Sequence, residues 1–211
     1  MPEIDELTIA DEPASWAALG FAVEGETCRI GRVALRLAGR AAGRGIVRWT
    51  LRDATTTELD GLPTALAGAT TAPLAERAPV HPNGVTRIDH VVAVSPALDR
   101  TVTALEAAGL DLRRVREEPT PAGAPRQAFF RLGAEILEAV QEPADVVERA
   151  GGAERPASFW GLALCCEDID ATVARLGEHV SEVRDAVQPG RRIASLRRSA
   201  GLGLPVALMT A

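Results

Sequence analysis

The stretch Arg87-Ile-Asp-His-Val-Val-Ala-Val94 is rich in β-branched residues and predicts a β-strand. The next segment, 98–108, repeats apolar residues at helical spacing and is followed by a glycine, so it predicts a helix that ends there. Two further strands are predicted at 126–132 and 135–141, separated by a glycine turn. The stretch therefore opens a unit that consists of a strand, a helix and two or three more strands.

The same order returns at the end of the chain, which indicates an internal repeat. Residues 159–166 predict a strand and residues 168–177 a short helix. Two more strands are predicted at 191–197 and 204–210. The segment 85–211 is thus expected to hold two copies of one α+β unit, paired in a single domain.

A third copy is predicted at the N-terminus, with strands at 4–9 and 29–37 on either side of a helix at 13–20. A strand at 45–51 could open a fourth, degenerate copy. Residues 53–84 are rich in Thr, Ala, Pro and Gly and predict a loop or linker. We therefore expect an N-terminal degenerate unit with its linker over 1–84 and a paired domain over 85–211.

Composition excludes several classes of protein. The 211 residues carry a formal net charge of −6, which argues against nucleic-acid binding because phosphate recognition needs clustered positive charge. No apolar run approaches the length of a membrane span, and the acidic N-terminus does not have the pattern of a signal peptide. Adjacent Cys165 and Cys166 offer no useful disulfide framework and predict buried thiols. A cytoplasmic protein without a nucleic-acid or membrane partner is the expectation.

Three groups of residues carry a resemblance to a known superfamily. They are Ile88-Asp-His-Val-Val, then Phe129-Phe-Arg-Leu-Gly with Ile136-Leu-Glu, and finally Trp160-Gly-Leu-Ala with Asp168-Ile-Asp-Ala. Over 85–211, and more weakly over 1–52, the chain resembles a glyoxalase-like member of the vicinal-oxygen-chelate superfamily, which includes glyoxalase I, extradiol dioxygenases and bleomycin-resistance proteins. The resemblance implies repeated βαβββ units that form an open, curled mixed β-sheet cup with helices outside.

The resemblance also implies a divalent metal site, with ligands on the first and last strands of each unit. In the first unit these positions hold His90 and Glu138, a donor pair suited to Zn, Ni, Mn or Fe. In the second unit we align Gly161 with His90 and Leu208 with Glu138, so that half lacks ligands. Two protein ligands fall short of the usual three. His90 could equally be a hydrogen-bonded structural residue, and Glu138 could lie on a solvent face.

The N-terminal copy places Glu6 at the His90 position and Arg36, a cation, at the Glu138 position. Candidate substrate-binding residues are collected from the first and second units: Phe129, Arg131 and Trp160. Arg191 and Arg192 follow a predicted turn and could either clamp an anionic substrate or lie in solvent.

Three functions remain open. The first is a metal-dependent lyase, isomerase or dioxygenase that acts on vicinal oxygens, with Glu138 as the catalytic carboxylate. The second is a metal-free protein that binds or sequesters a small molecule in an apolar cup. The third is a structural member whose site has decayed. Because three clear copies leave one unit unpaired, a homodimer is also expected.

Overall fold

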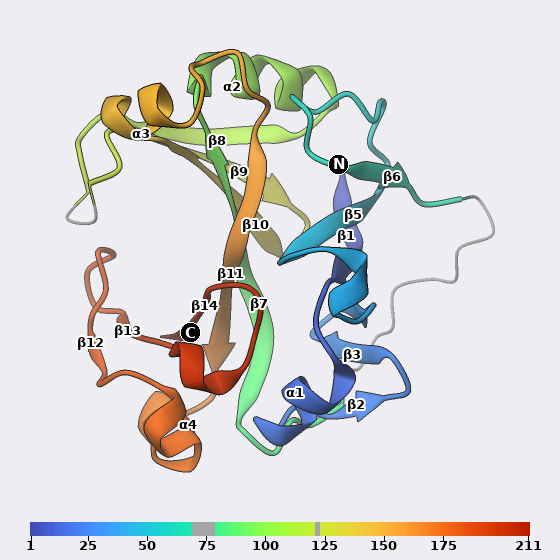
Figure 1. Cartoon of the computed structure of the whole chain (residues 1–211), viewed down its shortest axis with the longest axis vertical. Helices are drawn as coiled ribbons and strands as arrows, with labels where there is room; N and C mark the ends of the chain where they lie inside the picture. Colours follow the sequence, from blue (N-terminus) through green and yellow to red (C-terminus); the bar gives the residue numbers. More distant parts are fainter. Residues whose placement is uncertain (69–78, 121–122) are drawn as a thin grey trace.

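Two open, mixed β-sheets dominate the computed structural model, which describes residues 1–68, 79–120 and 123–211 (Figure 1). Sheet A has the strand order β2-β3-β4-β1-β5-β6, and sheet B has the order β12-β13-β14-β11-β7-β10-β9-β8. The short helices lie against the sheets rather than between their strands. The fold is therefore α+β with repeated βαβββ units, as predicted.

Sheet A and its helices are built from the N-terminal 66 residues. Their bounds are β1 Glu3–Ile9, α1 Pro13–Ala18, β2 Val23–Glu24, β3 Thr27–Ile30, β4 Val33–Leu37, the 3₁₀ helix η1 Arg40–Ala42, β5 Ile46–Arg52 and β6 Thr64–Leu66. The first five strands and helices form one complete unit, in which β4 returns parallel to β1. Part of the predicted linker, 69–78, lies outside the described residues.

Sheet B is built from two complete units. The first contains β7 Val85–Ser95, α2 Leu98–Ala107, β8 Asp111–Arg116, β9 Gln127–Leu132 and β10 Glu135–Gln141, and is followed by α3 Ala144–Arg149. The second contains β11 Ser158–Cys166, α4 Ile169–Leu176, η2 Gly177–His179, β12 Arg184–Asp185, β13 Arg192–Ser195, η3 Arg198–Ala200 and β14 Val206–Thr210. The two units meet where β7 and β11 pair antiparallel.

The N-terminal unit finds its partner within the chain. Strand β5 pairs antiparallel with β1, as β11 does with β7, and β6 runs parallel to β5. The segment from Gly45 onward is therefore a fourth, degenerate unit, in which the described residues between β5 and β6 form no helix. This pairing removes the reason for expecting a second chain, so the homodimer stays a prediction without that support.

One face of each sheet is apolar, and the two apolar faces share a single core. Trp49 of β5 packs edge-on against Phe159 of β11, with ring centroids 5.1 Å apart. Buried residues of both sheets belong to one continuous cluster, which includes Leu7 and Leu35 from sheet A and Val91 from sheet B. Residues 1–66 thus pack directly on residues 85–210, and the domain boundary near 84 stays a prediction.

The helices of sheet B cover the same apolar side. Helix α2 buries Leu98, Thr101 and Leu105, and Thr101 hydrogen-bonds Ser95 at the end of β7. Because side chains alternate along a strand, the opposite face of sheet B is left open. We call this open face the sheet-B cup.

Candidate functional site

A β-bulge at the middle of β7 places two polar side chains on the sheet-B cup. Ala163 of β11 lies opposite His90 and Leu164 lies opposite Ile88, so Asp89 is the extra residue of the bulge. A bulge changes the direction of the strand and lets consecutive side chains turn toward one face. Asp89 and His90 are in contact as a result, with 2.9 Å between the carboxylate oxygen and His90 Nδ1.

The same irregularity recurs in the other first strands. In β11 the extra residue is Trp160, directly before Gly161. In β1 it is Asp5, directly before Glu6. The structure therefore places Gly161 and Glu6 at the positions that match His90, as the repeat predicted.

Cross-strand pairing brings the predicted site residues onto one face. Glu138 of β10 lies between Phe129 of β9 and Val92 of β7. In the neighbouring row, Ile136 lies between Arg131 and His90. Paired residues on adjacent strands point to the same side of a sheet. Phe129, Glu138, Arg131 and His90 consequently share the sheet-B cup.

His90 and Glu138 are in direct contact. Their Nε2 and Oε2 atoms lie 3.2 Å apart, and the side chains are 19% and 14% exposed. Gln127 donates a short hydrogen bond to the other Glu138 oxygen. Since Asp89 holds Nδ1, the ring faces a carboxylate on each side. A neutral imidazole can donate to only one of them, whereas an imidazolium donates to both.

Arg191 anchors the far end of this chain of polar groups. Its guanidinium donates to both oxygens of Asp89, at 2.9 and 3.1 Å. Burial acts to raise the pKa of Asp89, but the hydrogen bonds and charges of His90 and Arg191 outweigh it and hold that pKa well below its ordinary range. Arg191 is therefore committed to Asp89, and Arg192 to Asp170, instead of lying free for a substrate.

Cys165 adjoins the same network and is unreactive there. Its sulfur lies 3.3 Å from Asp89. Burial, reinforced by the neighbouring carboxylate, raises the pKa of the Cys165 thiol to about 11, so it stays protonated at neutral pH. This agrees with the prediction of buried thiols.

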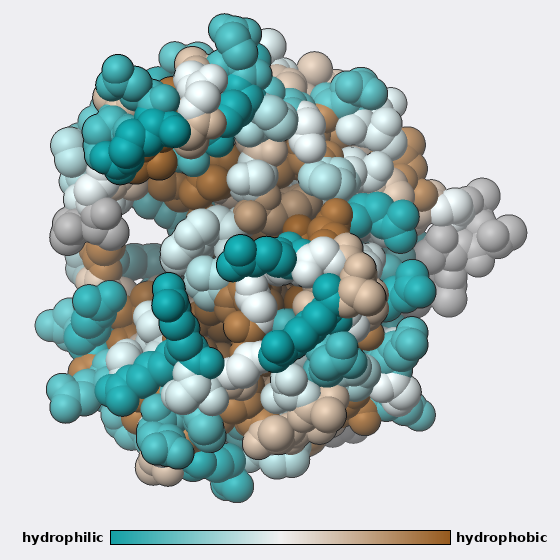
Figure 2. Space-filling view, in the orientation of Figure 1, coloured by the Kyte–Doolittle hydropathy of each residue, from teal (hydrophilic) through white to brown (hydrophobic). Residues whose placement is uncertain are grey.

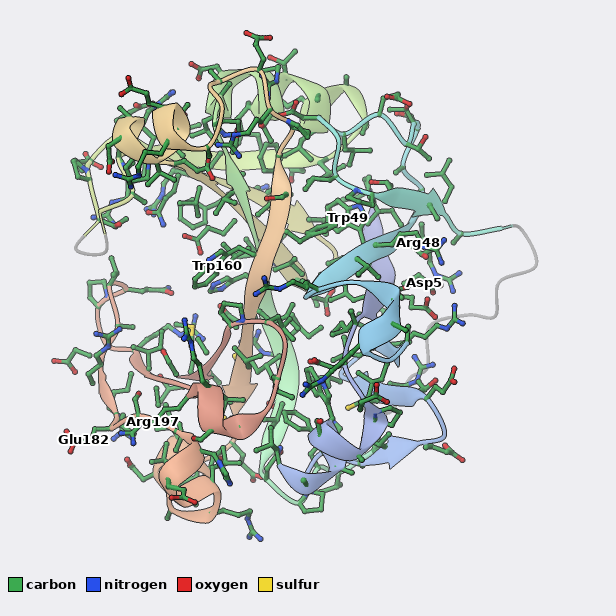
Figure 3. The ribbon with its side chains drawn as sticks, viewed as in Figure 1. Asp5, Arg48, Trp49, Trp160, Glu182 and Arg197 are labelled. Atoms are coloured by element: carbon green, nitrogen blue, oxygen red, sulfur yellow. The ribbon has the colours of Figure 1, made fainter. Side chains whose placement is uncertain are left out.

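Aromatic and cationic side chains flank the His90–Glu138 pair. The Arg114 guanidinium lies over the ring of Phe129, 5.2 Å from its centroid. Trp160 is 54% exposed, whereas Trp16 and Trp49 are fully buried. Figure 3 shows Trp160 and Trp49 on opposite sides of the sheet-B strands.

The second unit cannot supply matching ligands. A Cβ atom on Gly161 would lie 2.5 Å from the carbonyl oxygen of Pro205, so a histidine does not fit there without a backbone shift. The alignment of Leu208 with Glu138 was wrong by one residue. Ala163 pairs with Ala207, as Val92 pairs with Glu138, so Ala207 holds the matching position. Leu208 lies on the opposite, buried face.

The corresponding face of sheet A has a different set of side chains. Thr8 pairs with Arg36, which puts Arg36 at the Glu138 position as predicted. Thr8 donates a hydrogen bond to Glu6, and Arg52 pairs with Asp5 at 2.6 Å. This face of sheet A therefore has the same strand arrangement as the sheet-B cup but different side chains at the matching positions.

The side chains on this face do not supply the ligands of the divalent metal that the resemblance implied. His90 Nε2 and Glu138 Oε2 are close enough to bind one metal ion. Asp89 is already paired with Arg191. At the matching positions of the second unit, Gly161 and Ala207 have no side-chain atom that can bind a metal. Within 1–68, 79–120 and 123–211 no group of three His, Cys, Asp or Glu side chains is arranged to hold a metal ion. The residues do not fit a three-ligand centre.

Sequence reasoning missed two members of this network, Asp89 and Gln127, and it assigned the third, Arg191, to a substrate or to solvent rather than to Asp89. The adjacency of Asp89 and His90 was visible, but strand alternation assigns neighbours to opposite faces. Only the bulge turns both toward the cup. Arg191 is 102 positions from Asp89, and nothing local indicates that they meet.

Comparisons with known proteins place the fold. No protein-family model matches the sequence, and no curated protein matches it. A solved structure of a xylose isomerase-like TIM barrel/4-hydroxyphenylpyruvate dioxygenase fusion protein matches with a TM-score of 0.63 and 17% identity, over 99% of this chain and 48% of that chain. Methylmalonyl-CoA epimerase from Mycobacterium tuberculosis matches with a TM-score of 0.48 and 20% identity, over 60% of this chain and 89% of that one.

A Streptomyces coelicolor methylmalonyl-CoA epimerase variant, in complex with 2-nitronate-propionyl-CoA, has a TM-score of 0.47 and 24% identity, over 60% of this chain and 98% of that one. At these identities the comparison concerns the fold alone. The repeated βαβββ units have the glyoxalase-like fold that the resemblance implied. In the described part of the chain, every helix is too short or too polar to cross a membrane.

Proposed function

We propose that this protein binds a small organic carboxylate in the sheet-B cup. The observation that carries the proposal is the convergence of His90, Glu138, Phe129 and Arg131 on one open sheet face. Binding sites of this kind combine apolar walls with a few well-placed polar groups. The cup contains aromatic rings and arginine side chains without acidic partners among the described residues. Such a surface can bind an organic anion, with the arginines contacting its charge and the rings contacting its apolar part.

The cations on this face are available to a ligand. Arg131 is exposed, and Arg114 is exposed above the Phe129 ring. Neither makes an ion pair with a carboxylate within the described residues. A guanidinium binds a carboxylate through two parallel hydrogen bonds, so these side chains would hold the charged end of the ligand. Phe129 and Trp160 would contact its apolar part.

The His90–Glu138 pair would contact the remaining polar groups of the ligand. A second candidate function follows from the chain Asp89–His90–Glu138, in which the two contacts measure 2.9 and 3.2 Å. A carboxylate positioned in this way can accept a proton from a bound molecule and return it. Glu138 would be the general base, His90 would position it, and Asp89 would orient His90.

Binding in this cup does not require a metal, because the arginines supply the positive charge. The metal-assisted chemistry expected from the resemblance would need a third ligand from the substrate, water or another chain. Measuring the metal content of the purified protein and of the His90→Ala and Glu138→Ala variants distinguishes metal-free binding from metal-assisted chemistry. Stoichiometric metal that disappears in both variants would contradict the metal-free proposal.

Trp160 provides the readout for binding. It is the exposed tryptophan, and Trp16 and Trp49 are shielded at 0% exposure, so a ligand in the cup should change chiefly the Trp160 emission. We expect oxalate, pyruvate or benzoate to alter the fluorescence, and Trp160→Phe to abolish the response. No change with any of the three at millimolar concentration would refute the proposal.

A matched pair of variants locates the site. Arg131→Ala should weaken binding by roughly tenfold, the usual effect of losing a charged hydrogen-bond donor. Arg36→Ala removes an exposed arginine from the corresponding face of sheet A and should leave the affinity unchanged. Equal weakening by both would indicate non-specific charge attraction.

A further inference from the structure

A cleft among the described residues has a lining that shares no residue with the ligand-binding residues proposed for the sheet-B cup. It runs between the η1 segment, residues 40–44, and the segment 196–205 that leads into β14, with a volume of about 850 Å³. On the face shown in Figure 2, hydrophilic side chains lie on both sides of a paler strip in the lower centre. This volume is within the range of small-molecule sites, roughly 300–1,000 Å³.

The two walls of the cleft are tied together by a buried aspartate. Asp11, 1% exposed, accepts a hydrogen bond from the Gly203 amide at 2.7 Å and another from the Trp16 indole at 3.1 Å. A Cβ on Gly203 would lie 2.8 Å from the Asp11 carboxylate, so the close approach depends on glycine. Arg40 adds a hydrogen bond to the Gly201 carbonyl at 3.1 Å. Hydrogen bonds between its two walls thus hold the cleft in place.

Arginine side chains line this cleft without acidic partners. Arg40, Arg44 and Arg198 are all exposed, and no ion pair joins any of them to a carboxylate in the described part of the chain. Arg197 also borders the cleft, but Figure 3 shows its side chain at the outer edge of the molecule, with Glu182. Asp11 lines the cleft, and the Glu12 carboxylate beside it accepts a hydrogen bond from the Arg40 backbone amide at 3.0 Å, so the exposed arginines still outnumber the carboxylates.

The lining also contains leucines: Leu196, Leu202 and Leu204. They place apolar surface next to the guanidinium groups. A bare inorganic anion would use only the arginines, whereas an anion carried on an organic body would contact both kinds of side chain.

We propose that this cleft binds the phosphate group of a small organic phosphate, at a site separate from the sheet-B cup. A phosphate monoester carries nearly two negative charges at neutral pH, which suits a cleft where arginines outnumber carboxylates. The planar fork of arginine also suits phosphate oxygens. A long polyanion is disfavoured, because the rest of a chain with net charge −6 would repel it.

The proposal is tested by calorimetric titration of the full chain with phenyl phosphate and, separately, with inorganic phosphate. We expect phenyl phosphate to bind more tightly, because only it reaches the leucines. Arg44→Ala and Arg198→Ala should each weaken it by roughly tenfold. Arg48→Ala is the matched control: Arg48 is exposed on neighbouring β5, outside the cleft lining, and its loss should change the affinity by less than about twofold.

Three results of these titrations would overturn the assignment. They are no binding of phenyl phosphate, equal affinity for inorganic phosphate, which would indicate a free-anion site, and equal weakening by Arg48→Ala. Circular dichroism of each variant establishes that it is folded. Competition with the carboxylate that binds the sheet-B cup should be absent, since the two sites are distinct; mutual displacement would also contradict the proposal.

Discussion

Replacing Asp89 with alanine tests the network that orients His90. Asp89 is the common acceptor for His90 and for two donors of Arg191, and the Asp89 and Arg191 side chains are only 11% and 14% exposed. Removing one partner of a buried ion pair leaves the other charge uncompensated and costs about 3–5 kcal/mol. For a chain of this length, a loss of about 3 kcal/mol lowers the melting temperature by roughly 6–12 °C.

The assay is thermal and urea denaturation at neutral pH, with Asp111→Ala as the control. Asp111 also pairs with an arginine, Arg113, but their side chains are 42% and 63% exposed, and exposed pairs contribute little. The control should therefore lower the melting temperature by less than about 4 °C. If the two substitutions lowered the melting temperature equally, burial would not be the reason that the Asp89–Arg191 pair stabilises the protein.

The Asp89 contribution also has a defined dependence on pH. Because the pKa of this carboxyl is lower in the folded protein than its ordinary value of 3.8, the stabilisation is fully present above pH 3.8. It is lost as the pH falls below that value toward the folded-state pKa. The difference in unfolding free energy between wild type and Asp89→Ala should therefore be constant near neutral pH and shrink in acid. A difference that grows in acid would contradict the assigned charge state.

Two other perturbations test the framework. Gly161→Ala should destabilise the protein by about 1–3 kcal/mol in urea denaturation, because the new methyl group would meet the Pro205 carbonyl, whereas a tolerated alanine would mean that this loop can move away. Deleting residues 1–84 should leave 85–211 insoluble, since the deletion uncovers the apolar face of sheet B that packs on sheet A; a soluble, cooperatively folding fragment would show two independent domains.

Local sequence patterns were sufficient for the repeat and for one half of the candidate site. Period-two alternation and glycine stops locate β7, α2, β10 and β11 to within a few residues. The same alternation puts His90 and Glu138 on matching sides of two strands of one unit. The register in which β7 and β10 pair then brings the two side chains into contact.

The register between β14 and β11 could not be predicted from local sequence patterns. The alignment of the two units predicted Leu208 as the counterpart of Glu138, but the pairing of β14 with β11 begins at Val206 and makes Ala207 the counterpart. A shift of one residue moves a side chain to the other face, because the repeat of a strand is two residues. The alternating pattern of the sequence is compatible with either register. The register is decided only by how the two strands pair.

The sequence by itself determined which residues form strands and helices, which sides are apolar, and that His90 and Glu138 belong to one unit. Tertiary structure alone decided that the bulge turns Asp89 toward His90, that Arg191 closes the network, and that β5 supplies the partner of β1. The physical reason is the range of the interactions. Propensity and alternation act between near neighbours, whereas bulges, buried ion pairs and clefts depend on groups that only folding brings together.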